Sequence, residues 1–280
     1  MITYKNVGKR YGKITAVDAL ELEIPRGEFF ALLGPNGAGK TTIIRMTTAL
    51  TPVTSGSIEI DGEPVHRDLS KTKQRFGIVP QYSNLESELT ARENLEYHGR
   101  LYGMPSALRK SRIAELLEFA ELSDRADEKA NVYSGGMLRR LMIIKALMHN
   151  PDLLFLDEPT VGLDVSARRK IWDLLRIMNG RGLTIFLTTH YLEEAQALCQ
   201  RVGMIDRGKL ICLDSPDSII GRYGKYVLEY FQGGGTEYRF FNDRDEAVKA
   251  AETFDGVFQV REANLEDAFI KLTNRRIADQ

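Results

Sequence analysis

The sequence predicts an α/β fold with a parallel sheet buried between helices, and three observations support this prediction. Largely apolar runs at 29–33, 153–156 and 183–187 have the composition of strands that are buried on both faces. Segments with apolar residues at helical spacing separate these runs. Polar residues follow each run directly. Because ligands bind outside the carboxyl ends of the strands in open α/β sheets, we expect these polar residues to line one site.

The composition indicates a globular protein. Its 280 residues, 43% of them hydrophobic and 28% charged, suffice for one sizeable core and a smaller second one. The 38 Lys and Arg residues nearly balance the 39 Asp and Glu residues, so no positive field favours nucleic acid as a partner. Cys199 and Cys212 have no metal-ligand spacing and are expected to be free thiols in a reducing compartment. Without a signal peptide or an apolar run near the roughly 18 residues of a membrane span, action at a membrane is expected to need a partner.

The N-terminal part of the chain predicts strands at 2–5, 16–24 and 29–33, with a turn at 25–27 between the last two. The ring of Tyr11, upstream of the glycine-rich loop, could lie flat against a base, which would suit adenine. It could equally pack half-buried against the protein. The sequence leaves both alternatives open.

A glycine-rich loop follows the strand at 29–33 and precedes a helix. Such a loop places several backbone N–H groups at the positive end of a helix dipole, a geometry that binds phosphate. Its spacing matches the P-loop pattern, in which Lys40 would reach the β- and γ-phosphates and the Thr41 hydroxyl would bind Mg²⁺. The alternative is a glycine turn with an ordinary surface lysine, but the strand, loop and helix signals all lie where the motif requires them. The predicted phosphate-binding residues are Gly34, Pro35, Asn36, Gly37, Ala38, Gly39, Lys40, Thr41 and Thr42.

Short strands and then helices are predicted after the P-loop helix. A strand at 57–60 leads into a hairpin turn at 61–62, and a strand at 76–79 ends just before Gln81. A glutamine at a strand end can offer its amide oxygen to Mg²⁺, although a single Gln is usually a surface residue. Residues 86–122 have helical spacing and predict a helical insertion.

Ser134, Gly135 and Gly136 precede a predicted helix at 138–147. A serine hydroxyl and bare backbone amides at the positive end of a helix dipole form a second candidate anion site. Because Ser-Gly-Gly by itself is a weak signal, a simple helix N-cap at Ser134 is the alternative explanation.

Two further strand ends carry candidate catalytic residues. The run at 153–156 ends in Asp157, which would hold Mg²⁺, and Glu158, which would be the general base that polarises the attacking water. The strand at 183–189 delivers His190 to the position where a γ-phosphate contact would be needed. Adjacent carboxylates are often solvated turn residues and a lone His is often structural, but the P-loop upstream favours catalysis. The residues expected to gather around one phosphate site are Gln81, Asp157, Glu158 and His190.

In their order along the chain, these motifs resemble the nucleotide-binding subunit of an ABC transporter over roughly residues 1–215. The resemblance implies an α/β P-loop NTPase fold of the ABC type, with a RecA-like core, an N-terminal antiparallel β subdomain and a helical subdomain inserted at about 84–147. It also implies Mg²⁺-dependent ATP hydrolysis in a head-to-tail homodimer. In that dimer the segment 134–136 of one copy would close over the ATP on the P-loop of the other. Asp164 would couple the two sites, and His190 would contact the γ-phosphate.

The motif around residues 133–141 resembles the drug-resistance exporter branch of that family, whose permeases are of the ABC-2 type. The general signature Leu-Ser-Gly-Gly-Gln has Tyr133 and Met137 at its two ends here, and Met137 cannot make the hydrogen bonds of a glutamine. The C-terminal stretch 264–273 also resembles that branch. The implied partner is a polytopic membrane permease, docked near residues 84–105 and holding this chain at the cytoplasmic face of the membrane.

Residues 217–280 predict a small α+β unit separate from an ABC domain at 1–216. Its expected elements are a hairpin with a glycine turn at 233–235, a helix, a third strand and a final helix capped by Asn264. The expected ranges of the two hairpin strands, the helix and the third strand are 226–231, 236–241, 245–254 and 257–260, and the final helix is expected to carry Glu266 and Asp267 in its first turn. The unit could have a regulatory or dimer-contact role, or it could be a passive cap that ends in a solvated tail at 274–280.

Two rival functions are consistent with the motifs. The first is a soluble ABC-type ATPase that remodels ribosomes or DNA. Such machines usually carry two nucleotide domains or long coiled coils, and this chain has neither an internal repeat nor sustained heptads. The second is a non-hydrolytic regulatory ATP-binding module, against which the presence of both Glu158 and His190 argues.

Overall fold

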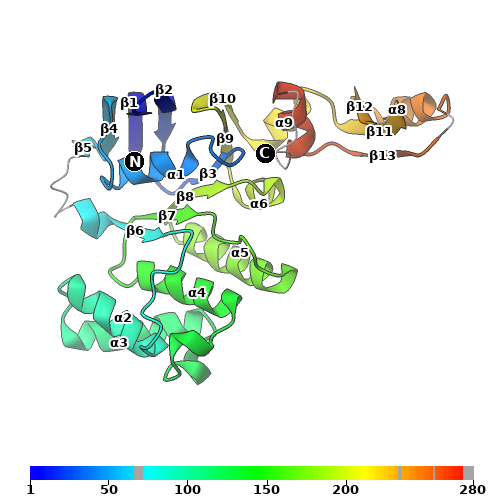
Figure 1. Cartoon of the computed structure of the whole chain (residues 1–280). Coiled ribbons are helices and arrows are strands. Elements are labelled where there is room, and N and C mark those ends of the chain that lie inside the picture. The colour runs from blue at the N-terminus through cyan, green and yellow to red at the C-terminus, as the bar shows by residue number, and fades with distance from the viewer. Residues whose placement is uncertain (66–71, 233–234, 255, 274–280) are drawn as a thin grey trace.

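The computed structural model describes residues 1–65, 72–232, 235–254 and 256–273 (Figure 1). Two large sheets form the upper part of the molecule in this view, helices lie below them, and a small third sheet lies to one side. Among these described residues, no helix is both long enough and apolar enough to cross a membrane.

The N-terminal sheet is antiparallel and has the strand order β2-β1-β4-β5. Its strands are β1 (Ile2–Tyr11), β2 (Ile14–Ile24), β4 (Ser55–Ile60) and β5 (Glu63–Pro64). The first strand continues six residues beyond the predicted end at Lys5, and shifts in its pairing with β2 and β4 occur in that continuation. The predicted turn at 61–62 joins β4 and β5, and Asp61 has a φ of 52° there.

The central sheet has the strand order β10-β9-β3-β8-β7-β6, and its strands are parallel except at the β10 edge. The predicted buried strands are present, and every residue of β3, β7 and β8 is buried. The strands are β3 (Phe29–Leu33), β6 (Phe76–Val79), β7 (Leu153–Asp157), β8 (Thr184–Thr189), β9 (Arg201–Asp206) and β10 (Lys209–Asp214). The flanking helices are α1 (Lys40–Thr47), α5 (Val165–Gly180) and α6 (Leu192–Leu198), and a short 3₁₀ turn, η1 (Thr72–Arg75), precedes β6.

The predicted helical insertion forms a group of three helices below the central sheet (Figure 1). They are α2 (Ala91–Leu101), α3 (Ser106–Phe119) and α4 (Gly135–Ala146), with 3₁₀ turns η2 (Ser123–Arg125) and η3 (Ala130–Val132) between the last two. Thr90 and Glu93 form a reciprocal capping box, which explains why α2 begins at Ala91. Leu95, Leu116 and Leu141 belong to the same hydrophobic core as the strands of the central sheet.

The C-terminal residues form a three-stranded sheet with helices around it. Its elements are α7 (Pro216–Gly221), β11 (Tyr226–Gln232), β12 (Gly235–Phe241), α8 (Arg244–Ala251), β13 (Phe258–Glu262) and α9 (Leu265–Thr273). The predicted hairpin is β11–β12, while residues 233–234 of its turn and the predicted tail at 274–280 lie outside the described residues. As predicted, Asn264 caps the last helix, since its Oδ1 accepts hydrogen bonds from the Glu266 and Asp267 amides.

Two of the C-terminal helices share the core of the central sheet. Ile219 of α7 and Leu265 and Phe269 of α9 are buried in that core, whereas the small sheet has its own cluster around Leu228 and Tyr230. The domain boundary at 216–217 stays a prediction. What the packing determines is that α7 and α9 anchor the small sheet to the rest of the chain.

A cluster of aromatic and histidine rings joins the helical group to the central sheet. His98 of α2 packs against Tyr102 and His149, with ring centroids 4.8 and 5.8 Å away, and those two rings stack on each other at 3.8 Å. Burial, with smaller contributions from the nearby Lys145 and His149, lowers the pKa of His98 to about 4. The folded protein therefore keeps His98 neutral at pH values where the unfolded chain would protonate it.

Above about pH 6.5, we expect the titration of His98 to leave the free energy of unfolding unchanged. As the pH drops from there toward 4, we expect the free energy of unfolding to fall. In that window the unfolded chain binds a proton at His98 and the folded chain does not, so protons favour unfolding. The loss should be about 2 to 3 kcal/mol at pH 4.5. Urea denaturation at pH 7 and pH 4.5 measures it, and His98→Phe, which keeps the ring packing, should lose less. Equal losses in the two proteins would contradict this assignment.

Candidate functional site

The loop between β3 and α1 has the backbone of a phosphate cradle. Gly37 and Gly39 have φ values of +77° and +109°, a region that L side chains rarely adopt. A Cβ at Gly39 would lie 2.5 Å from the Ala16 carbonyl oxygen, and a Cβ at Gly34 would lie 2.2 Å from that of Ile205. Gly39 is the N-cap of α1 and offers no side chain to it, so the first N–H groups of the helix remain available to an anion.

A cavity of about 360 Å³ lies in front of this loop. Residues far apart in the sequence meet there, since Gln81 follows β6 and Glu158 follows β7 while the rest come from the loop, α1 and β2. The cavity is lined by Ala16, Pro35, Asn36, Gly37, Gly39, Lys40, Thr41, Thr42, Gln81 and Glu158. It therefore lies at the carboxyl edge of the central sheet, where the sequence predicts the phosphate site.

Lys40 presents a buried cation to this cavity. Its Nζ donates hydrogen bonds to the carbonyl oxygens of Gly34 at 2.6 Å and Pro35 at 3.1 Å, and lies 3.2 Å from Glu158 Oε1. Burial lowers the pKa of Lys40, and the Glu158 carboxylate opposes that shift. The cation is thus held by oxygen atoms that phosphate oxygens could replace without moving the lysine far.

Asp157 lies beside the first turn of α1 and has two hydroxyl partners. Its Oδ1 accepts hydrogen bonds from Thr41 Oγ1 at 3.2 Å and from Thr188 Oγ1 at 2.6 Å. Over the described ranges, no group of three or more His, Cys, Asp or Glu residues could hold a metal by itself. One carboxylate with one hydroxyl is nevertheless the donor set of a Mg²⁺ that shares its other ligands with substrate phosphates and water. These residues therefore fit such an ion.

Glu158 lies between Lys40 and His190. His190 Nδ1 is 2.5 Å from Glu158 Oε2, and the side chain of Glu158 is 6% exposed. Its backbone has a φ of 51°, and its N–H donates to the Thr188 carbonyl oxygen, which fixes this left-handed conformation. A carboxylate held by a cation on one side and an imidazole on the other is oriented to accept a proton from water.

Several predicted residues do not line this cavity in the single chain. Asp157 and His190 lie behind its lining in contact with Thr41 and Glu158, and Gly34 and Ala38 belong to the loop without lining the cavity.

The segment 134–136, Asp164 and Tyr11 lie outside the lining as well. Ser134 caps α4, accepting from the Met137 amide at 3.3 Å, and it is exposed together with Gly135. Asp164 caps α5 by accepting from the Ala167 amide at 2.8 Å. Tyr11 is 45% exposed, with Lys9 Nζ 4.9 Å from its ring centroid. The N-cap at Ser134 is thus present, and an exposed N-cap leaves the neighbouring amides open to a second molecule.

Three polar residues near the site were not predicted from the sequence. Thr188 bonds to Asp157, Arg139 donates to the Glu158 carbonyl oxygen, and Glu194 is fully buried against Thr160. The β7–β8 register pairs Asp157 with Thr188, so strand alignment was the signal that could have found that one. The other two lie within helices and had no local signal.

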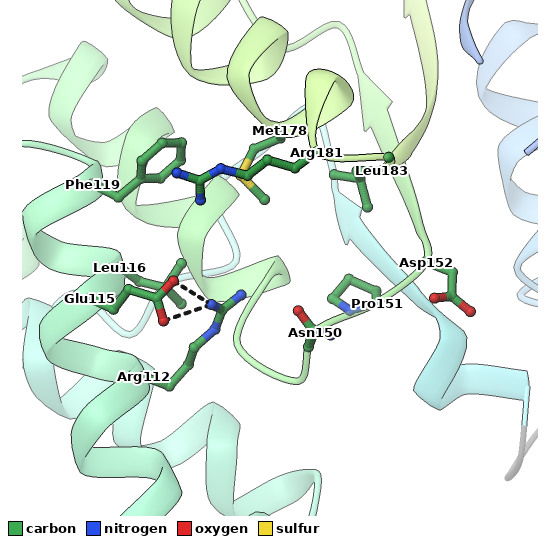
Figure 2. A pocket seen from close by; sticks show the side chains of 11 residues that line it. Arg112, Glu115, Leu116, Phe119, Asn150, Pro151, Asp152, Met178, Arg181 and Leu183 are labelled. Atoms are coloured by element: carbon green, nitrogen blue, oxygen red, sulfur yellow. Dashed lines mark hydrogen bonds and ion pairs between the residues drawn. The ribbon is translucent and has the colours of Figure 1, made fainter. Parts of the chain in front are cut away.

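A second cavity, of about 220 Å³, lies at the opposite edge of the sheet (Figure 2). The residues at 150–152 and 181–183 that line it precede β7 and β8. Its two arginines already have partners, since Arg112 bonds both carboxylate oxygens of Glu115 at 2.8 Å and the Arg181 guanidinium lies 5.3 Å from the Phe119 ring centroid. The cavity in front of the glycine loop is therefore the stronger candidate for chemistry.

Comparisons with known proteins show which family this chain resembles. The family described as ABC transporter matches residues 17–161. The chain is 42% identical to the Nod factor export ATP-binding protein I of Cupriavidus metallidurans, over 100% of this chain and 99% of that protein. It is 44% identical to the linearmycin resistance ATP-binding protein LnrL of Bacillus subtilis, over 80% of this chain and 72% of that protein. A bacterial ABC transporter cassette solved as a dimer superposes with a TM-score of 0.70 at 33% identity, covering 77% of this chain and 98% of that one.

Proposed function

This chain belongs to the family of ABC transporter ATP-binding proteins, and we propose that it couples ATP hydrolysis at the glycine-loop cavity to export by a separate membrane permease. It is an ATPase and the ATP-binding subunit of an ABC exporter, as its sequence similarity to export ATP-binding proteins over almost the whole chain shows. The predicted ABC-type P-loop fold is confirmed. The observation that carries the catalytic proposal is that Lys40 and Glu158 line one cavity in contact with each other, while His190 holds the Glu158 carboxylate from its other side.

In the proposed reaction, the phosphates of ATP occupy the glycine loop and water attacks the γ-phosphate in line. Lys40 and the loop amides stabilise the charge on the transferring group. Glu158 accepts the proton of the attacking water, and His190 holds the Glu158 carboxylate while contacting the γ-phosphate. The Lys40–Glu158 contact of 3.2 Å would then exchange for a contact of Lys40 with the phosphates and of Glu158 with the attacking water.

Mg²⁺ is proposed as the metal that accompanies ATP. Thr41, Asp157 and Gln81 would hold it, because they supply a hydroxyl, a carboxylate and an amide oxygen at the carboxyl edge of the sheet. When bound, Mg²⁺ neutralises charge on the phosphate oxygens. Thr188 keeps the Asp157 carboxylate in one orientation through its 2.6 Å hydrogen bond.

The functional unit is proposed to be a homodimer with two ATP molecules between the subunits. Ser134, Gly135 and Gly136 of one copy would complete the site on the P-loop of the other, and Asp164 would couple the two sites. The exposure of the α4 N-terminus and the dimeric form of a solved cassette support this arrangement. Tyr11 would stack on adenine at the outer end of the site, since its ring is half exposed.

The proposed partner is a polytopic permease of the ABC-2 type, with this chain bound peripherally at the cytoplasmic face of the membrane. No nucleic acid partner is proposed, because the formal net charge is −1. Closure of the dimer on ATP does work only if the permease binds the closed and open dimers with different affinities. The chain then acts as a switch driven by ATP binding and reset by hydrolysis.

Purification of the Glu158→Gln protein from native membranes in the presence of ATP tests the partner. A multi-span membrane protein should co-purify in stoichiometric amount, because blocked hydrolysis keeps the dimer closed. The same purification with Glu193→Gln, an exposed carboxylate on α6, is the matched control. Ribosomes or DNA in place of a membrane protein would support the soluble remodelling ATPase instead.

A further inference from the structure

We propose that Arg139 is a positioning residue that transmits the position of α4 to Gln81 and Glu158. The inference rests on the proposed function, in which α4 begins at the ATP of the partner copy. It adds to that function a route by which one ATP site of the dimer influences the other.

Arg139 connects three segments of the chain through one guanidinium group. Its Nη1 donates to the Pro80 carbonyl oxygen at 2.8 Å, and its Nη2 donates to the carbonyl oxygens of Gln81 at 3.0 Å and Glu158 at 3.4 Å. The first two acceptors follow β6, and the third follows β7. A side chain from the helical group thus bonds directly to the backbone of the proposed metal ligand and the proposed general base.

The burial of Arg139 makes these contacts hard to replace. The residue is 7% exposed, so water cannot readily satisfy the carbonyls if the guanidinium withdraws. Burial lowers the pKa of Arg139, while the carboxylates of Glu194 and Asp157 oppose the shift, and an arginine remains charged in proteins. The planar fork of a guanidinium can donate to several acceptors at once, which an ammonium group does less well.

Arg139 lies on the same helix as the proposed contact to the partner's ATP. Ser134 caps α4 and Arg139 is five residues further along it, so a shift of the helix toward a bound anion carries the guanidinium with it. The carbonyls of Gln81 and Glu158 would follow, and these residues serve the ATP on the chain's own P-loop. ATP bound at one site therefore adjusts the catalytic groups of the other, which is a coupling between two sites.

The test compares Arg139→Met and Arg139→Lys with a neighbouring control in the full chain. Arg140→Met is the control, because Arg140 bonds Ala120 and Glu121 within the helical group rather than the Gln81 or Glu158 backbone. The rate of ATP hydrolysis is measured against ATP concentration to give kcat and the Hill coefficient. The Kd for ATP and the urea midpoint are measured on the same proteins.

We expect Arg139→Met to lower kcat by tenfold or more and to reduce the Hill coefficient to 1, with the Kd for ATP unchanged. Arg139→Lys should recover part of both, and Arg140→Met should match the wild type. A purely structural role would lower the urea midpoint without changing the Hill coefficient, and this result overturns the proposal. If Arg139→Met does not fold, wild-type kcat and cooperativity in Arg139→Lys overturn it. A wild-type protein without ATPase activity would instead overturn the proposed hydrolytic mechanism.

Discussion

Glu158→Gln is expected to abolish most ATP hydrolysis while leaving ATP binding intact. The amide cannot accept the proton of the attacking water, and general-base catalysis contributes about 10²- to 10⁴-fold, so kcat should fall by that factor. Glutamine keeps the size of the side chain and can still accept a hydrogen bond from Lys40 or His190, both of which contact Glu158. Phosphate release under saturating ATP measures kcat, and equilibrium binding of a fluorescent ATP analogue measures affinity.

The control for this prediction is Glu193→Gln. Glu193 lies three residues after His190 on an exposed face of α6, and its nearest cation, the Arg168 guanidinium, is 3.9 Å away. An exposed ion pair of this kind contributes little to stability, so the variant should remain folded. Glu193 has no role in the proposed reaction, so kcat should not change either. Full activity in Glu158→Gln would remove Glu158 as the base and leave His190 as the nearest alternative.

Lys40→Met is expected to remove both ATP binding and hydrolysis and to destabilise the protein. The lysine supplies the buried cation of the cavity, and its loss should lower kcat/KM by 100-fold or more. The side chains of Lys40 and Glu158 are 5% and 6% exposed, so the variant leaves the Glu158 carboxylate buried with His190 as its remaining close partner. Breaking such a pair costs roughly 3 to 5 kcal/mol in the free energy of unfolding.

The double variant Lys40→Met, Glu158→Gln separates the two effects. Removal of both charges should restore most of the lost stability, because no buried charge is left unpaired, but it should not restore hydrolysis. Lys110→Met, at an exposed position of α3, should resemble the wild type in both measurements. If the double variant is no more stable than Lys40→Met, the contact with Glu158 does not stabilise the fold.

Local signals predicted most of the secondary structure and the composition of the cavity. The buried strands, the glycine loop and the hairpin turns each depend on a few neighbouring residues, so the chain carries their signals within short windows. Element ends were less accurate. Helix α8 stops at Ala251 rather than Phe254, and β13 covers Phe258–Glu262 rather than 257–260, because packing against β11 determines where they end.

By itself, the sequence determined the family, the order of the motifs and the strand ends that carry Asp157, Glu158 and His190. The tertiary structure decided which side chains touch. Arg139 reaches carbonyls 59, 58 and 19 residues away in the chain, and Thr188 reaches Asp157 across 31 residues. Contacts of this kind depend on strand register and on how a helix packs against a sheet. No short window of sequence carries that information, since the same residues would look ordinary on any helix or strand.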